Sequence, residues 1–393
     1  MTAPSRATFY LACATPPEPT IRELLFRDNL LNPFCLTHPL IFFFRSLERL
    51  YLFLSPSMEE LANNCPVEAD PWNTSPFHTS LVTICDDGTR LNTTVQGPPR
   101  HQNQPVIVFI SGGFEGGYCW ARVANLLAPH IRSVRFDQAG TGQSSTFHKP
   151  RSAENIAQEL EALLQTIAMR PPYVLVAHSY GGIVAREFLA LHSVGGEGVV
   201  GMVLVDTNTE HSWEASDLPL DSFGAIMRGL DFGEVSGLKA CLTEQELEAV
   251  KQDEKACEEF GTEEAGIALM HSSAKSLASK KQLEGTALGD VPLSVILGDA
   301  PKAMWAVVRA AEQDQIGTPE QRHEVRVWAE RFERVAEPLQ REQMKLSRNA
   351  RWVEAKKSGH HVQLQEPELV ADEIEKIMAD ARLSCGDSSG QAG

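Results

Sequence analysis

The amino-acid sequence predicts an α/β fold in which a mainly parallel sheet is covered by helices on both faces. Short apolar runs that are typical of buried strands alternate along the chain with amphipathic helical segments. This β-α-β alternation is typical of parallel sheets, because each crossover helix packs back onto the sheet. At 393 residues the chain is long enough for one large α/β domain with insertions or for two ordinary domains.

The composition excludes several classes of function. Hydrophobic residues make up 42% of the chain and charged residues 22%, values typical of soluble globular proteins. The formal net charge of −17 argues against a nucleic-acid partner, because phosphate binding needs clustered Lys and Arg. The eight cysteines lack the spacing of zinc, haem or redox sites, so we expect reduced thiols. No sustained apolar run opens the chain, so we expect no signal peptide and a cytoplasmic location.

An apolar segment rich in Leu and Phe extends from residue 21 to residue 54. Prolines and charged residues interrupt every window of about 20 residues that a transmembrane helix would need. The segment therefore predicts amphipathic helices, which form a helical extension at residues 1–58. Two interpretations stay open: an arm that packs on the main domain or on a second subunit in a homodimer, and an anchor at a membrane surface or a lipid substrate.

The strands and helices of the core follow in order after a predicted linker at residues 55–76. Two strands, 77–86 and 91–96, alternate in polarity and are joined by a turn at Asp87-Gly88. Further strands are predicted at residues 106–110, 133–136, 173–178, 201–205, 293–297 and 350–355. Amphipathic helices are predicted at residues 152–169, at residues 181–192 and from Pro367 onward.

Two helical segments interrupt the predicted core. The core comprises residues 77–206 and 291–382, and residues 207–290 predict a helical cap over the carboxyl edge of the sheet, with a capping box at Thr243 to Glu246.

Residues 301–349 predict a second helical insertion, with a helix start at Thr318. Trp328 and Phe332 recur there at helical spacing, and we expect them to pack in a core rather than line a pocket. Residues 383–393 are small and polar and predict a disordered tail.

The segment Tyr173 to Gly182 reads Tyr-Val-Leu-Val-Ala-His-Ser-Tyr-Gly-Gly. A β-favouring run leads into Ser179, and glycines and a helix follow, which predicts a strand, a tight turn and a helix with the serine exposed at the turn. Strand and helix nearly touch at such a turn, so small residues are needed two positions before and after the serine, as Ala177 and Gly181 are. The segment resembles the nucleophile elbow of the α/β-hydrolase superfamily, whose usual motif has Gly at the position of Ala177.

A nucleophilic serine needs a base to take its proton and a carboxylate to orient that base. In the α/β-hydrolases these residues follow in the order serine, acid, histidine. Ser358-Gly359-His360 comes after the last predicted strand and resembles the histidine loop of the family, so the resemblance implies His360 as the base. His361 does not match the motif. Adjacent histidines also occur in metal sites, but no third ligand lies at ligand spacing, so we expect no metal.

Two aspartates are candidates for the acid. The commoner family position follows the strand at residues 293–297, but Pro301 occupies the matching position here and Asp299 lies nearby. A minority of members use the end of the preceding strand, where this chain has Asp206. We favour Asp206, with Asp299 as the alternative. An aspartate at a strand end also commonly only caps a loop or helix.

The resemblance further implies an oxyanion hole made of two backbone N–H groups. The residue after the nucleophile, Tyr180, supplies one. Ser111-Gly112-Gly113 resembles a family variant with Ser-Gly in place of His-Gly, which makes Gly113 the second donor. Residues 136–144 resemble another loop of the family, in which we expect Asp137 to be structural.

These motifs together cover residues 77–382 and resemble the serine-nucleophile, esterase-like branch of the family. The resemblance implies a hydrolase that cleaves a carboxylic ester or thioester through an acyl-enzyme, without metal or organic cofactor. The large cap and the aromatic N-terminal segment favour a fairly apolar substrate of small or medium size. Ser179 argues against the epoxide hydrolases and haloalkane dehalogenases, whose nucleophile is Asp. An acyltransferase with the same triad and a catalytically silent binding protein stay open as alternatives.

Overall fold

The computed structural model describes residues 70–384 except residues 86, 102, 196–197 and 261–262. In this part of the chain one sheet has the strand order β1-β2-β4-β3-β5-β6-β7-β8. The strands are β1 Phe77–Thr83, β2 Arg90–Gln96, β3 Val106–Ile110, β4 Ser133–Phe136, β5 Tyr173–His178, β6 Val199–Val205, β7 Leu293–Leu297 and β8 Ala350–Glu354. The pairs β1/β2 and β2/β4 are antiparallel, and all other neighbours are parallel. The predicted α/β fold with a mainly parallel sheet is therefore confirmed.

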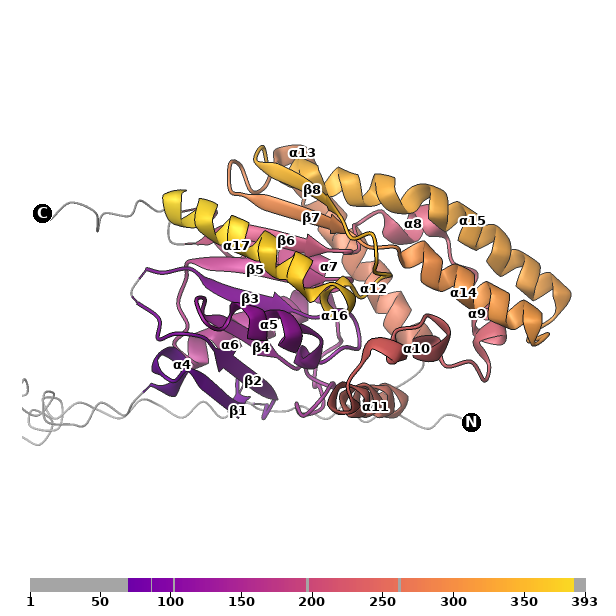
Figure 1. Cartoon of the computed structure of the whole chain (residues 1–393), viewed down its shortest axis with the longest axis horizontal. Coiled ribbons are helices and arrows are strands. Elements are labelled where there is room, and N and C mark those ends of the chain that lie inside the picture. Colours follow the sequence, from indigo (N-terminus) through magenta and orange to yellow (C-terminus); the bar gives the residue numbers. More distant parts are fainter. Residues whose placement is uncertain (1–69, 86, 102, 196–197, 261–262, 385–393) are drawn as a thin grey trace, which may run out of the picture. The chain divides into compact units, whose positions relative to one another are not determined.

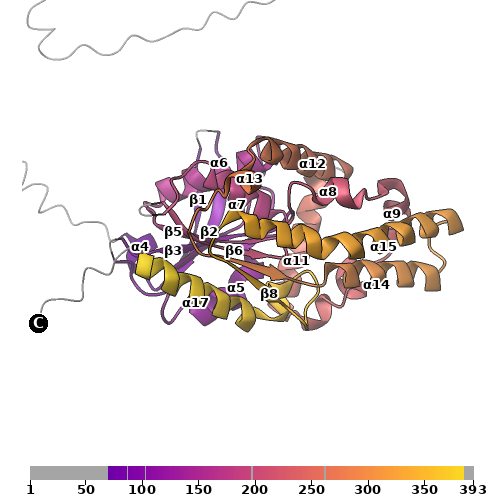
Figure 2. The same cartoon turned by 90° about the horizontal axis from the view of Figure 1, so that it is seen from above.

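Helices cover both faces of this sheet. Helices α6 (Ala153–Thr166) and α7 (Gly181–Leu189) lie on one face, and α5 (Ala121–Leu127) and α17 (Pro367–Ser384) on the other, as Figure 2 shows. Each face of the sheet has its own apolar core, and alternate side chains of β3 pack into one or the other. Val108 packs on the side of α6 and α7, and Phe109 on the side of α5 and α17. Every β3 side chain is fully buried, which is why an unbroken apolar run predicts a central parallel strand.

Further helices interrupt the alternation after β6 and after β7. Most of them lie beyond the carboxyl ends of the strands, toward which the arrows point in Figure 1. Between β6 and β7 the helices are α8 Ser212–Ser216, α9 Leu220–Met227, α10 Phe232–Val235, α11 Glu244–Phe260, α12 Glu263–Ser279 and α13 Gln282–Gly285. After β7 come α14 Ala300–Gln313 and α15 Pro319–Glu342, and after β8 the short α16 Val362–Gln365.

Helices α9, α14 and α15 share an apolar cluster of their own. Ile226, Val307 and Trp328 are buried in it. Trp328 stacks on Phe332 with the ring centroids 5.3 Å apart. As the spacing predicted, Trp328 is a core residue, and Phe332 packs against the same cluster.

Helix starts follow the predicted caps, whereas some segment ends differ. Thr318 and Thr243 accept hydrogen bonds from the backbone N–H groups three residues on, at 3.2 and 3.3 Å. The predicted linker is wrong at its end, where Pro71–Thr74 form the short helix α4. Asp70 caps this helix by accepting the N–H of Trp72 at 3.0 Å, and proline is favourable in a first turn.

The predicted extension at residues 1–58 lies outside the described residues, as does the predicted tail apart from residues 383 and 384, which end α17. None of the helices described between residues 70 and 384 combines the length and the apolar character that crossing a bilayer demands.

A buried ion pair joins α7 to the segment that follows β6. Arg186 contacts Glu210 through both terminal guanidinium nitrogens, Nη1 and Nη2, with Nη2 2.8 Å from Oε1, and the side chains are 0% and 3% exposed. Gln282 accepts a further hydrogen bond from Arg186 Nε at 3.0 Å. Helix α7 begins just after Ser179, and Glu210 lies on the same segment as Asp206. The pair therefore fixes the predicted nucleophile and the predicted acid relative to each other.

We expect Arg186→Met to lower the free energy of unfolding by about 3–5 kcal/mol, because Glu210 would stay buried without a partner charge. Urea unfolding followed by tryptophan fluorescence measures the loss. The double variant Arg186→Met/Glu210→Leu should recover much of it.

Arg331→Met is the matched control, since Arg331 and Asp217 form an exposed pair 3.3 Å apart that should contribute less than about 1 kcal/mol. Equal stability of wild type and Arg186→Met would rule out the assigned role of this pair.

Candidate active site

The turn after β5 has the predicted geometry of a nucleophile elbow. Ser179 directly follows β5 and adopts a φ of +52°, a left-handed conformation that non-glycine residues rarely take. A Cβ at Gly181 would lie 2.5 Å from the carbonyl oxygen of Ser111, so only glycine allows α7 to start so close to the end of β3. Ala177 is fully buried on the strand side of the turn. Ser179 itself stays partly exposed at the tip.

Main-chain hydrogen bonds hold this turn to the end of β6. The N–H of Ser179 donates to the carbonyl of Val205 at 3.3 Å, and the N–H of Asn208 donates to the carbonyl of Ser179 at 2.9 Å. Asp206 lies between these partners and also has a positive φ, +44°. Its N–H donates to Ile296 of β7 at 2.8 Å. Two strained residues thus lie at the adjacent carboxyl ends of β5 and β6.

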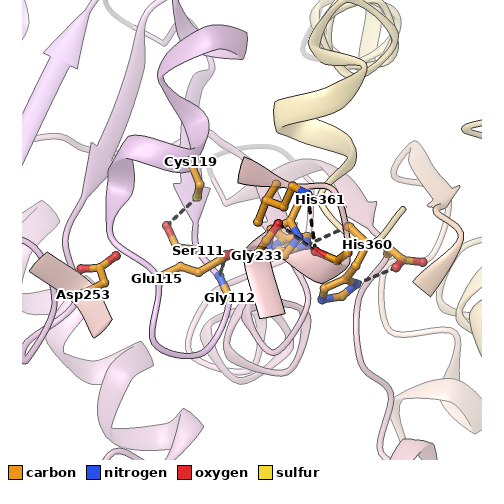
Figure 3. A network of polar contacts seen from close by, with 12 residues as sticks. Ser111, Gly112, Glu115, Cys119, Gly233, Asp253, His360 and His361 are labelled. Atoms are coloured by element: carbon orange, nitrogen blue, oxygen red, sulfur yellow. Dashed lines mark hydrogen bonds and ion pairs between the residues drawn. The ribbon is translucent and has the colours of Figure 1, made fainter. Parts of the chain in front are cut away.

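Asp206 and His360 meet directly. Figure 3 shows His360 and the polar network around it. The Nδ1 atom of His360 lies 2.6 Å from Oδ2 of Asp206, whose other oxygen accepts the N–H of Gly298 at 2.9 Å. The Asp206 side chain is 4% exposed and that of His360 25%. The His360 ring lies 4.5 Å, between centroids, from that of His178, the residue before Ser179. The structure therefore brings Asp206 and His360 together beside the elbow.

Asp299, the alternative acid, has a different position. Its Oδ1 accepts the N–H of Lys302 at 3.1 Å and caps α14. An N-terminal cap is a common role for an aspartate.

The contact with Asp206 sets the proton positions on His360. Because the carboxylate accepts a hydrogen bond from Nδ1–H, the single proton of the neutral ring lies on Nδ1, and Nε2 has a free lone pair. Burial lowers the pKa of His360, but the hydrogen bond and charge of Asp206 and the charge of Glu115 outweigh burial and raise the pKa above its usual value. His360 therefore has the tautomer and the basicity of a proton acceptor.

The Ser111–Gly113 loop presents backbone N–H groups beside the elbow. The N–H of Gly112 donates to Oε2 of Glu115 at 3.2 Å and is occupied. The N–H groups of Gly113 and Tyr180 donate to no acceptor among the described residues. Gln138 Nε2 holds the loop by donating to the carbonyl of Ser111 at 3.1 Å. Both predicted oxyanion donors are thus unoccupied, and their role in catalysis stays a prediction.

Helices α11 and α12 contact the loops around the elbow. Met270 of α12 lies over Gly113, where an added Cβ would come within 2.3 Å of its terminal methyl group. The hydroxyl of Tyr180 donates to Ser273 of α12 at 3.0 Å. Asp253 of α11 accepts the N–H groups of Gly116 at 2.7 Å and of Gly142 at 2.6 Å. Burial raises the pKa of Asp253 to about 7.

Asp137 joins the loop that contains Gly117 to the loop that contains Gln143. Its two oxygens accept the N–H groups of Gly117 at 2.7 Å and Gln143 at 2.9 Å, which fits the expected structural role.

Sequence patterns missed a second group of polar residues next to the predicted triad. The carboxylate of Glu115 lies between two imidazoles, 2.9 Å from Nδ1 of His178 and 2.7 Å from Nε2 of His361. A histidine at the end of an otherwise apolar strand was the available signal for His178, because burial of an imidazole needs polar partners. In the part of the chain that is described, no group of three or more His, Cys, Asp or Glu side chains is arranged to hold a metal ion.

Comparison with known proteins agrees with this architecture. Residues 107–373 match the model of the alpha/beta hydrolase family. The chain is 34% identical over 322 residues to an "AB hydrolase superfamily protein" of Gibberella zeae, over 79% of this chain and 98% of that protein. It is 32% identical over 317 residues to the "probable transporter efuK" of Hormonema carpetanum, over 78% of this chain but 44% of that longer protein.

Among solved structures, Cfl2 from Burkholderia cenocepacia superposes with a TM-score of 0.51 at 20% identity, over 77% of this chain and 96% of Cfl2. This likeness concerns the fold alone. The family model, in contrast, matches well over half of the sequence and includes the elbow, Asp206 and His360. The chain belongs to the alpha/beta hydrolase family.

Proposed function

We propose that this protein is a serine hydrolase that cleaves a carboxylic ester or thioester through an acyl-enzyme intermediate. The proposal depends on one observation: the 2.6 Å contact between His360 Nδ1 and the buried carboxylate of Asp206, beside the elbow of Ser179. Such a contact prepares a histidine to remove the proton from a serine hydroxyl.

The reaction begins when Ser179 Oγ attacks the carbonyl carbon and Nε2 of His360 takes its proton. Asp206 keeps the ring oriented and stabilises the imidazolium that forms. The N–H groups of Gly113 and Tyr180 donate to the oxyanion of the tetrahedral intermediate, and each such donor contributes roughly 3–4 kcal/mol. His360 then protonates the leaving alcohol or thiol. Water then attacks the acyl-enzyme carbonyl while His360 takes a proton from it. His360 returns a proton to Ser179 Oγ as the carboxylic acid leaves.

The surroundings of Gly113 favour an apolar substrate. Phe114 is 43% exposed, and Met270 lies over the glycine. An acyl chain beside these side chains would bury apolar surface. Activity on p-nitrophenyl esters of increasing chain length should therefore rise from acetate to medium chains.

Labelling with a fluorophosphonate probe tests the nucleophile. The probe reacts with a serine only where a base activates it, so wild type should be labelled at Ser179. Ser179→Ala and His360→Ala should abolish labelling. Intact-mass and peptide mass spectrometry measure the extent and the site.

Ser272→Ala, on an exposed position of α12, and His211→Ala, at an exposed histidine, are the matched controls and should label like wild type. A folded wild-type protein that stays unlabelled would favour a silent binding protein. Transfer of the acyl group from the acyl-enzyme to an added alcohol, in preference to water, would favour the acyltransferase.

Asp206→Asn should lower kcat about 10⁴-fold, because an amide that donates to Nδ1 leaves the wrong tautomer of His360. The acid limb of the residual kcat/KM profile should also move to lower pH, since the charge of Asp206 raises the pKa of His360. Asp299→Asn is the matched control: it removes the charge of the α14 cap and should leave kcat unchanged. Equal losses in both variants would contradict the choice of Asp206.

A further inference from the structure

The contact between His178 and Glu115 needs a proton in addition to the single N–H proton that a neutral imidazole carries. His178 is fully buried. Its Nε2 lies 3.0 Å from the carbonyl oxygen of His360, and its Nδ1 lies 2.9 Å from Oε2 of Glu115. A carbonyl oxygen only accepts, so Nε2 carries a proton. The Nδ1 contact therefore requires a second proton, either on the ring or on the carboxyl group.

The donors around Glu115 place this second proton on the ring. Besides His178, the N–H of Gly112 at 3.2 Å and Nε2 of His361 at 2.7 Å point at the carboxylate. Donors that converge on a carboxylate favour its charged form. Burial alone raises the pKa of Glu115, but the charges and hydrogen bonds of His178 and His361 hold it well below its usual range. If Glu115 is ionised, both protons lie on the His178 ring, one on Nδ1 and one on Nε2.

Burial acts against a charged His178 and, with the charges of His360 and His361, lowers the pKa of its ring, although the charge and hydrogen bond of Glu115 raise it. A neutral ring, however, would point a nitrogen lone pair at an acceptor oxygen within hydrogen-bond distance. An imidazolium satisfies both acceptors, and with Glu115 it forms a pair without net charge. The hydrogen-bond geometry therefore decides for the imidazolium.

Other titratable groups surround the pair. Those that act on it are His360, His361, Asp253, Tyr118 and Cys119. Burial and the nearby Glu115 raise the pKa values of the Tyr118 phenol and the Cys119 thiol, so both stay neutral.

We propose that Glu115 and the imidazolium of His178 form a buried ion pair that positions the Ser111–Gly113 loop against the His360 loop. Glu115 holds the N–H of Gly112, next to the oxyanion donor Gly113, and His178 holds the carbonyl of His360. Neither side chain is assigned a contact with a reacting atom, so both are positioning residues. Their effect on catalysis rests on the proposed function, whereas the ion pair itself does not.

Nitrogen-15 NMR of the histidine side chains in the full chain tests the ion pair. The chain has 12 histidines. At about pH 9, well above the usual histidine pKa of about 6.5, the His178 ring should still have both nitrogens protonated. In Glu115→Gln this signal should become that of a neutral ring protonated at Nε2, because the new amide donates to the Nδ1 lone pair. His178→Asn assigns the signal, and Glu368→Gln, at an exposed carboxylate on α17, should leave it unchanged.

A His178 ring that is already neutral in wild type at this pH overturns the ion pair. The absence of a doubly protonated ring from the wild-type spectrum would suffice, so this outcome does not depend on whether any variant folds.

The rate of fluorophosphonate labelling tests the positioning role. Glu115→Ala should slow labelling about 100-fold, because small misplacements of catalytic groups have losses of this size. Glu115→Gln should slow it less, because its amide still bridges His178 and His361. With an ester substrate the loss should fall on kcat and leave KM nearly unchanged. Glu368→Ala is the matched control and should label at the wild-type rate.

The outcomes separate this inference from the proposed function. Unlabelled wild type with a doubly protonated His178 would refute the hydrolase and retain the ion pair. Labelling of Glu115→Ala at the wild-type rate would overturn the positioning role and leave the hydrolase intact.

Discussion

The close approach of α7 to the end of β3 is the constraint on which the rest of the site depends. Gly181 lies so near the carbonyl oxygens of Ser111 and Ile110 that an added Cβ would come within 2.5 and 2.7 Å of them. This approach allows Ser179 to turn sharply with a φ of +52° and places the Ser111–Gly113 loop next to this predicted nucleophile. The same atoms that make the turn tight thus bring two parts of the predicted oxyanion hole together.

Strain at the site is balanced by hydrogen bonds from neighbouring strands. Ser179 and Asp206, both with positive φ, lie at the ends of adjacent parallel strands and exchange main-chain bonds with β6, its following segment and β7. A conformation of this kind costs about 1–3 kcal/mol and persists only where the surroundings fix it. Here the sheet supplies that support, because the carboxyl ends of parallel strands meet at one edge.

Several buried charges in the described part of the chain are paired, and these pairs connect segments that are distant in sequence. Arg186 and Glu210 join α7 to the segment after β6. Asp206 contacts His360 from the next strand end, and Glu115 links the Ser111–Gly113 loop to the His360 loop through His178 and His361. Removing one member of such a pair leaves an uncompensated charge, so each pair restricts how the site can relax. The edge of the sheet at which the proposed site lies is therefore held by electrostatics as well as by packing.

Local patterns in the sequence determined the strands, the elbow at Ser179, the histidine loop and the order of the core. These features depend on side-chain periodicity and on glycine at tight turns, which a short window of residues contains. Only the tertiary structure distinguishes Asp206 from Asp299, because both follow parallel strands and only Asp206 meets the His360 ring. Glu115 and Asp253 gave no local signal, since His178 lies 63 residues from Glu115 and Gly116 lies 137 residues from Asp253. Contacts of this kind exist only once the sheet and the helices beyond it have assembled.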